Sequence, residues 1–273
     1  MREVVDIHTH ILPGIDDGAK NWDMCLKMIN KSWDFGVRKI IATPHYVPWR
    51  REIPVRKIQE LCREAEENAK RELGKPMKIY PGNELYYHLE LIDKLNEGKV
   101  LTLADSRYIL VEFDIDVPYR ELYQGLSRLR MEQYHPIVAH VERYRCLRKP
   151  GRLEEVKKTG ALFQMNQKAF QKGLLDETGR WSRQRLMQGE IDFIASDMHN
   201  LTSREPFDEK NMADLSGGTF GCLWGSRVYR VFCDSDLYIH VYHAGIDKRN
   251  NIGLSGGSAA GFPVNKGLYS ANQ

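Results

Sequence analysis

The sequence predicts an α/β protein whose parallel strands form a closed or distorted barrel. Seven short apolar runs recur between residues 4 and 195, and longer amphipathic stretches lie between many of them. Strands that alternate with helices are typical of a parallel sheet, because the crossover between two parallel strands usually contains a helix. The chain has 273 residues, and this length favours one barrel over two separate domains.

The apolar runs have the length and the β-branched content of strands. The first contains two valines and an isoleucine, and the second contains two isoleucines and a threonine. We therefore expect seven strands, at residues 4–7, 39–43, 78–81, 108–111, 136–139, 162–165 and 191–195.

Two of the intervening stretches, 23–35 and 55–73, have the periodicity of helices. The second is rich in Glu, Lys, Arg and Ala, and it places Ile58, Leu61 and Ala65 on one face. A glycine follows each stretch where a C-terminal cap is expected. Both stretches are therefore predicted to be helices that cover the sheet.

Helical periodicity ends near residue 214, where the sequence becomes an atypical Gly-rich tail. Within the tail, the segment 228–242 could form one or two strands. We predict a barrel domain at 1–213 and a C-terminal segment at 214–273, to which the sequence assigns no role.

The composition is that of a soluble globular protein, with 42% hydrophobic and 28% charged residues and a formal net charge of +3. This balanced charge argues against nucleic-acid binding. No apolar run of about 18 residues predicts a membrane span, and the start resembles no signal peptide. Five cysteines lie scattered without CxxC spacing, which favours a reduced, cytoplasmic protein.

Residues that commonly bind metals follow six of the predicted strands. They are His8 and His10, His45, Glu84, Glu112, His140, and Asp197 and His199. The carboxyl ends of barrel strands meet at one rim, and residues two apart in a strand point to the same side. We therefore expect these side chains to form one site.

This set offers nitrogen and carboxylate oxygen but no thiolate, which favours Mn²⁺, Fe²⁺, Co²⁺ or catalytic Zn²⁺ over structural zinc. Eight ligands are too many for one ion, so two or three ions are expected, with Glu84 as a bridge. Two ions about 3.5–4 Å apart can generate hydroxide and stabilise the oxygens of a phosphoryl transfer.

Three further residues are candidates for catalysis. Arg143 and Arg204 follow ligand positions closely, and a guanidinium group can bind phosphate oxygens with two parallel hydrogen bonds. Either could instead be a surface charge. Asp17 lies in the loop after the first strand and could protonate a leaving group, although an aspartate at this place could equally form a turn.

These residues lie in motifs that resemble a known family. HTH at 8–10 followed by LPGIDDG at 12–18 is similar to the opening of the PHP (polymerase and histidinol phosphatase) superfamily. The sequence resembles more narrowly the bacterial manganese-dependent tyrosine-protein phosphatases of capsule and exopolysaccharide gene clusters, the CpsB/YwqE type. Further matching stretches are 42–45, 82–87, 106–113, 139–144 and 195–200.

The resemblance implies a distorted (β/α)₇ barrel of the PHP fold with a trinuclear centre, usually of manganese. It implies that the eight residues above are ligands and that Arg143 and Arg204 hold the phosphoryl group. The substrate would be phosphotyrosine in the tail of a partner bacterial tyrosine kinase, attacked directly by a metal-activated hydroxide. The family continues beyond about residue 206 with helical segments, so the Gly-rich tail here suggests a frame shift or a lineage-specific replacement.

Other functions remain open. Cys146 and Arg152 match the C-x₅-R pattern of cysteine phosphatases, but a nucleophilic thiol needs a depressed pKa and a cradle of backbone amides. A small-molecule phosphatase of the histidinol-phosphatase type, or a nuclease, would use the same metals. A non-catalytic protein could retain them as structure.

Overall fold

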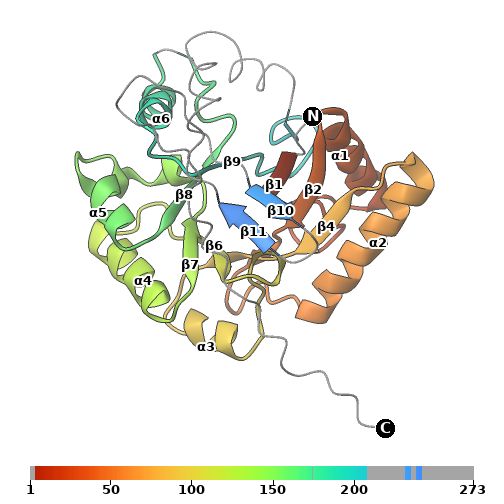
Figure 1. The fold of residues 1–273 in the computed structure, drawn as a ribbon, viewed down its shortest axis with the longest axis horizontal. Helices are drawn as coiled ribbons and strands as arrows, with labels where there is room; N and C mark the ends of the chain where they lie inside the picture. The colour runs from red at the N-terminus through yellow and green to blue at the C-terminus, as the bar shows by residue number, and fades with distance from the viewer. Residues whose placement is uncertain (1–3, 174, 208–230, 235–237, 242–273) are drawn as a thin grey trace.

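A computed structural model describes residues 4–173, 175–207, 231–234 and 238–241. Parallel strands form a curled sheet in the middle of the molecule, and helices surround it (Figure 1). The predicted α/β fold class is confirmed.

The barrel strands belong to two sheets in which every strand pair is parallel. The first sheet has three strands, in the order β1 (Val4–Thr9), β2 (Val37–Ala42) and β4 (Lys78–Pro81). The second has six, in the order β3 (His45–Tyr46), β5 (Glu84–Tyr86), β6 (Tyr108–Glu112), β7 (His135–Val138), β8 (Leu162–Asn166) and β9 (Phe193–Ala195).

The two sheets are continuous along the chain. Strand β3 follows β2 after only two residues, and β5 likewise follows β4. A parallel bridge between Thr9 and Met198 brings the segment after β9 next to β1. The seven predicted strands are therefore present in order, while β3 and β5 were not predicted because Pro44 and Gly82 interrupt the apolar pattern.

In the part of the chain that the structure describes, six α-helices connect the strands: α1 (Trp22–Asp34), α2 (Val55–Leu73), α3 (Leu91–Asn96), α4 (Tyr119–Met131), α5 (Arg152–Lys158) and α6 (Glu177–Met187). Short 3₁₀ turns lie at Leu103–Asp105, Val141–Arg143 and Arg145–Leu147. The two predicted helices are confirmed, and Ile58, Leu61 and Ala65 are all buried. Helix α2 ends at Gly74, whose φ of 64° is the left-handed conformation that glycine adopts most easily.

Strand residues that point into the barrel form its apolar interior. Ile7, Ile41, Leu110, Ile137 and Phe193 come from five different strands and are buried in one cluster. Burying an aliphatic or aromatic side chain of this size contributes about 1.5–3 kcal/mol. The apolar cluster therefore fixes the strands from which the polar residues at their carboxyl ends project.

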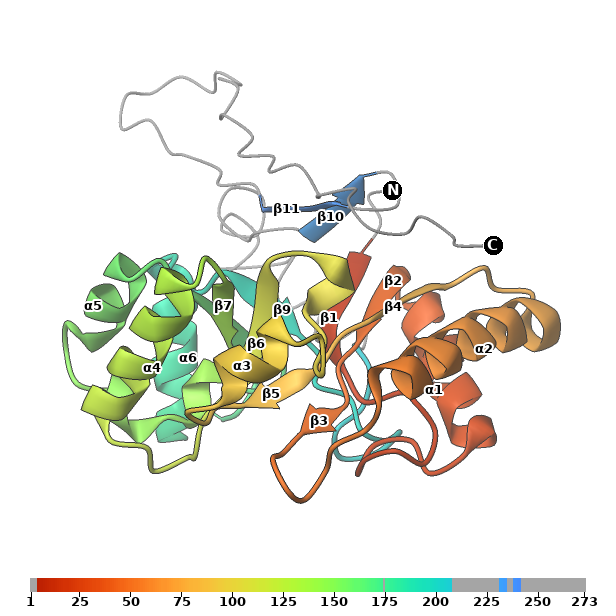
Figure 2. The ribbon, with the colours of Figure 1, turned by 90° about the horizontal axis from the view of Figure 1, so that it is seen from below.

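An antiparallel pair, β10 (Val231–Asp234) and β11 (Tyr238–Val241), lies within the segment where one or two strands were predicted. Figure 2 shows this pair on one side of the barrel and the loop between β3 and α2 projecting from the opposite side. The remainder of 214–273 lies outside the described residues, so the division at residue 213 stays a prediction. Among the described residues, no helix has the length and apolar character to cross a membrane.

Candidate metal centre

All eight residues predicted as ligands lie in one cluster at the carboxyl ends of the barrel strands. His8 lies in β1, His45 in β3 and Glu84 in β5, while Glu112 ends β6. His10, His140, Asp197 and His199 lie within four residues after the end of a strand. In each of the eight, a ring nitrogen or carboxylate oxygen lies within 3.5 Å of a carboxylate oxygen or ring nitrogen of another member.

His8, His10, Glu84 and Asp197 form the most buried part of this cluster. The Nε2 atoms of His8 and His10 are 3.2 Å apart, and each lies 3.3 Å from Oε2 of Glu84. Oδ1 of Asp197 lies 3.3 Å from the His8 nitrogen and 3.5 Å from the His10 nitrogen. Atoms that share one ion at about 2.0–2.2 Å lie about 3–3.6 Å from their neighbours, so the atoms of His8, His10 and Glu84 fit a single ion, with Oδ1 of Asp197 next to the two histidines.

Glu84 connects this group to a second one. Its Oε1 lies 2.8 Å from Nε2 of His140, and its Oε2 lies 2.9 Å from Nδ1 of His45. Glu112 completes the second group, with oxygens 3.2 Å from His45 and 3.5 Å from His140. Because the two Glu84 oxygens face different histidines, the carboxylate has the position expected of a bridge.

Asp17 joins His10, His45 and His199 in a third group with metal-binding geometry. Its oxygens lie 3.4 Å from Nε2 of His45 and 3.6 Å from Nε2 of His199. Burial raises the pKa of Asp17, but the neighbouring histidines outweigh it and the pKa is lowered. A lowered pKa disfavours the protonated form that a proton donor needs, and the predicted role of Asp17 stays a prediction.

Several polar atoms at the centre of the cluster are buried without a hydrogen-bond partner among the described residues. They include Oδ1 of Asp197 and Nε2 of His199. Buried polar atoms are nearly always paired, and an ion is one explanation for unpaired atoms within a cluster of metal-binding side chains. These orphaned atoms therefore fit the group of divalent ions that the ligand types predict.

Two of the predicted ligands have strained backbones. His140 has a φ of 34° and Asp197 a φ of 53°, in the left-handed region that non-glycine residues rarely adopt. Each such residue costs about 1–3 kcal/mol, and strain of this kind is concentrated at functional sites. The fold therefore holds both side chains in the cluster at a cost in stability.

Asp16, which the sequence analysis did not single out, orients His10. Its Oδ2 accepts a hydrogen bond of 2.7 Å from Nδ1 of His10, and its Oδ1 accepts another from the backbone N–H of Gly18. A Cβ on Gly18 would lie 2.0 Å from the carbonyl oxygen of His10, so only glycine allows this approach. The Asp-Asp-Gly sequence in the loop was the available signal.

Gln164 is the second supporting residue that the sequence analysis missed. Its Oε1 lies 3.0 Å from Nδ1 of His8 and accepts a 2.8 Å hydrogen bond from the backbone N–H of His140. Its Nε2 donates to Asn166, whose amide donates in turn to Oδ2 of Asp197. One amide thus links three predicted ligands, and no motif in the sequence marks it.

Arg143 and Arg204 both reach the cluster. Their guanidinium groups donate to the same atom, Oδ2 of Asp197, at 2.9 and 2.6 Å. About a third of each side chain remains exposed, so both can also face a ligand that enters from solvent. Their convergence on one carboxylate supports the phosphate-binding interpretation over that of scattered surface charges.

The close packing of histidines and carboxylates shifts their pKa values strongly. Burial lowers the pKa of His10, but Asp16 and Glu84 outweigh it and raise the pKa to about 9. Burial likewise lowers the pKa of His140, which Glu112 and Glu84 raise to about 9. His199 differs, because burial and the neighbouring His10 lower its pKa to about 3. Such a spread of values is typical of functional sites.

Cys146 lacks the features of a nucleophile. Burial raises the pKa of its thiol, whereas a cysteine phosphatase requires a lowered one. Arg152, the arginine of the C-x₅-R match, donates a hydrogen bond to the backbone oxygen of Cys146 and contacts the ring of Tyr119. These contacts favour a structural role for both residues.

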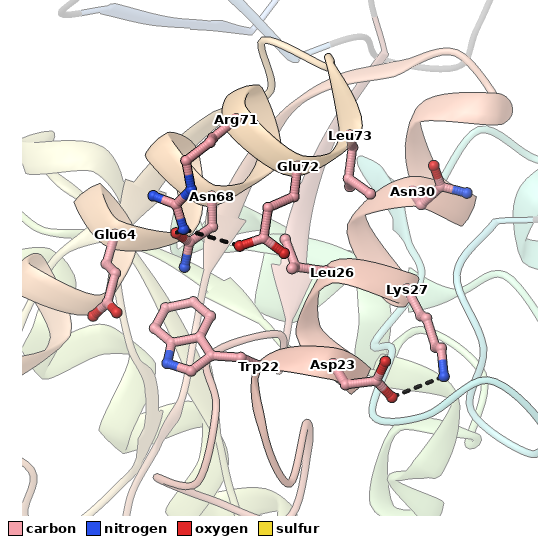
Figure 3. Close-up of a pocket in the computed structure, with 10 residues that line it drawn as sticks. All are labelled: Trp22, Asp23, Leu26, Lys27, Asn30, Glu64, Asn68, Arg71, Glu72 and Leu73. Carbon is pink, nitrogen blue, oxygen red and sulfur yellow. Dashed lines mark hydrogen bonds and ion pairs between the residues drawn. The ribbon is translucent and has the colours of Figure 1, made fainter.

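A separate pocket of about 730 Å³ lies between α1 and α2 (Figure 3). Four of its five charged residues pair with one another, Lys27 with Asp23 at 2.8 Å and Arg71 with Glu72 at 2.9 Å. None of the predicted site residues lines it. The pocket is therefore not part of the candidate metal centre.

The chain is similar to a family of capsular polysaccharide synthesis proteins. Residues 4–216 match the family model described as "Capsular polysaccharide synthesis, CpsB/CapC". The chain is 35% identical over 210 residues to the tyrosine-protein phosphatase CpsB of Streptococcus pneumoniae, covering 75% of this chain and 86% of that protein. It is 32% identical over 206 residues to the tyrosine-protein phosphatase YwqE of Bacillus subtilis, covering 74% and 79%.

Solved structures show the same relationship. A chain from the crystal structures of the metal-dependent tyrosine phosphatases YwqE and CpsB superposes with a TM-score of 0.74 and 28% identity, over 81% of this chain and 90% of that one. The histidinol phosphate phosphatase of Lactococcus lactis gives a TM-score of 0.50 at 13% identity, over 84% and 96%. This second likeness extends to the fold alone.

Proposed function

The chain belongs to the CpsB/CapC family, and we propose that it is a metal-dependent protein-tyrosine phosphatase. The observation that carries the proposal is the cluster of histidines and carboxylates around Glu84, with two arginines directed at Asp197. Relatives that cover most of this chain are tyrosine-protein phosphatases, which favours this function over histidinol phosphate hydrolysis.

The proposed ligands are the eight residues named from the sequence: His8, His10, His45, Glu84, Glu112, His140, Asp197 and His199. We propose Mn²⁺ as the native ion, and Fe²⁺, Co²⁺ and Zn²⁺ suit the same ligands. When bound, two or three such ions would supply a hydroxide nucleophile at neutral pH and withdraw charge from the phosphoryl oxygens.

The protein's own groups prepare the site for this chemistry. Asp16 and Gln164 fix the ring orientation of His10 and His8, leaving both Nε2 atoms directed at Glu84. Arg143 and Arg204 would bind the phosphoryl oxygens and stabilise the negative charge of the transition state. Hydrolysis would proceed by direct attack on phosphorus, without a phosphoenzyme.

The proposed substrate is the phosphotyrosine tail of a bacterial tyrosine kinase that regulates capsule or exopolysaccharide synthesis. Its support is membership of a capsular polysaccharide synthesis family and the names of the relatives. A cytoplasmic location, expected from the scattered cysteines, belongs to the same proposal.

The decisive test is hydrolysis of a phosphotyrosine peptide by the purified chain, after chelation and after addition of Mn²⁺. Histidinol phosphate serves as the competing substrate, and His199→Ala and Cys146→Ser serve as variants. We expect activity that Mn²⁺ restores, that prefers the peptide, that His199→Ala loses and that Cys146→Ser keeps. Activity that resists chelation and disappears in Cys146→Ser would instead establish a cysteine mechanism.

A further inference from the structure

Trp49 is unusually exposed for its size. It lies in the loop between β3 and α2, and 82% of its surface is accessible to solvent. Its φ of 59° is in the left-handed region, and its backbone N–H donates a 2.7 Å hydrogen bond to Oε1 of Glu52. The fold therefore holds a large aromatic side chain in solvent and accepts backbone strain to do so.

The loop that carries Trp49 is a hydrogen-bonded hairpin that contacts the candidate metal centre. Val47 and Arg51 pair through two backbone hydrogen bonds of 3.0 and 2.8 Å, so the loop is a tight hairpin. Arg51 donates a 3.0 Å hydrogen bond to Oδ1 of Asp17, the same atom that lies 3.4 Å from His45. The loop that carries Trp49 therefore contacts the candidate site through Arg51, and it is the loop that projects between β3 and α2 in Figure 2.

The segment after β5 meets this loop from the other side. The ring of His88 lies 6.2 Å from that of Trp49 and 6.0 Å from that of Tyr46. Both ring nitrogens of His88 are buried without a hydrogen-bond partner among the described residues. The next residue, Leu89, is 75% exposed. Together, Trp49 and Leu89 present apolar surface beside an otherwise polar and charged site.

We propose that Trp49 binds the peptide segment that flanks the phosphotyrosine, and that it makes the enzyme selective for peptides over free phosphotyrosine. Exposed tryptophans that pack against a partner contribute much of the binding energy in protein complexes. The neighbouring Arg50 is exposed, so the loop suits acidic residues beside the phosphotyrosine. This inference rests on the proposed function, since it concerns the substrate of the same site.

The test compares two substrates in the Mn²⁺-loaded full chain: free phosphotyrosine, and a phosphotyrosine peptide with acidic flanking residues. We expect Trp49→Ala to raise KM for the peptide about tenfold, with kcat unchanged and with both constants for free phosphotyrosine unchanged. Trp49→Phe should restore part of the loss. Met131, at the end of α4, is 78% exposed, and Met131→Ala is the control. It should leave KM and kcat unchanged for both substrates.

The outcomes separate this inference from the proposed function. An equal fall in kcat/KM for both substrates, or an unchanged KM for the peptide, would overturn the role of Trp49 without contradicting the proposed phosphatase activity. A wild-type chain that hydrolyses neither substrate with Mn²⁺ would overturn both proposals. Equal thermal unfolding temperatures of Trp49→Ala and wild type would show that the variant is folded.

Discussion

The carboxylate of Asp16 holds the imidazole of His10 through a 2.7 Å contact between Oδ2 and Nδ1. Because a carboxylate only accepts hydrogen bonds, Nδ1 must carry the proton, and Nε2 is directed toward Glu84 and Asp197. Burial raises the pKa of Asp16, but the hydrogen bond with His10 outweighs it and lowers the pKa to about 2. Pairing of a ligand histidine with a carboxylate is a common device of metal sites.

Substitution of Asp16 by Asn should therefore weaken metal binding. The loss of a supporting partner commonly reduces metal affinity about 10–100-fold, and we expect an effect of this size for Mn²⁺ in a chelator competition titration. Asp23→Asn, in the exposed first turn of α1, is the matched control. Unchanged affinity in Asp16→Asn would show that the contact does not support the site.

Gln164→Leu should destabilise the metal-free protein as well as weaken metal binding. The variant leaves the N–H of His140 and Nδ1 of His8 without their acceptor, and an unsatisfied buried donor costs about 1–3 kcal/mol. The free energy of unfolding in urea measures this loss. Gln124→Leu, at an exposed position of α4, is the control. Equal stability of the two variants would contradict the proposed network.

Arg143→Ala and Arg204→Ala should each reduce kcat/KM for a phosphotyrosine peptide while retaining the metal. Removing one donor that stabilises transition-state charge commonly costs about 10²–10³ in rate. Mn²⁺ affinity should not fall, because each substitution removes a positive charge next to Asp197. The side chain of Arg56 is 89% exposed, and Arg56→Ala is the control. A parallel loss of Mn²⁺ would instead assign the arginines to the support of the centre.

Metal binding should release protons at pH 7. The pKa values of His10 and His140 are raised to about 9, above the value of about 6.5 for unfolded histidine. Their protonation therefore stabilises the metal-free fold below about pH 6.5, and this contribution is lost as the pH rises through about 9. Because a bound ion displaces these protons, metal affinity should rise with pH. For each proton displaced, the affinity should increase up to about tenfold for each unit by which the pH rises.

Calorimetric titration with Mn²⁺ in two buffers of different ionisation enthalpy measures the released protons directly. The observed enthalpies should differ between the buffers at pH 7. Identical enthalpies would mean that these histidines are already neutral before the metal binds.

The sequence by itself determined the fold class and the chemical character of the site. Apolar runs of strand length could be recognised because the strands are buried and flanked by helices. The ligand-type residues could be recognised because each follows such a run within a few residues, as His45 and Glu84 follow the runs at 39–43 and 78–81. Parallel barrel topology then requires those ends to meet, so the convergence followed from local patterns alone.

Only the tertiary structure decided which residues support and surround the site. Gln164 lies 156 residues from His8 in the chain, and the hydrogen bond between them depends on the placement of β8 and β1 on either side of the β9 segment. Asp16 and Asp17 are neighbours of equal chemistry, and the turn at Gly18 directs one to His10 and the other to His45 and Arg51. Side-chain direction of this kind is set by packing and backbone strain between distant segments, which no local pattern encodes.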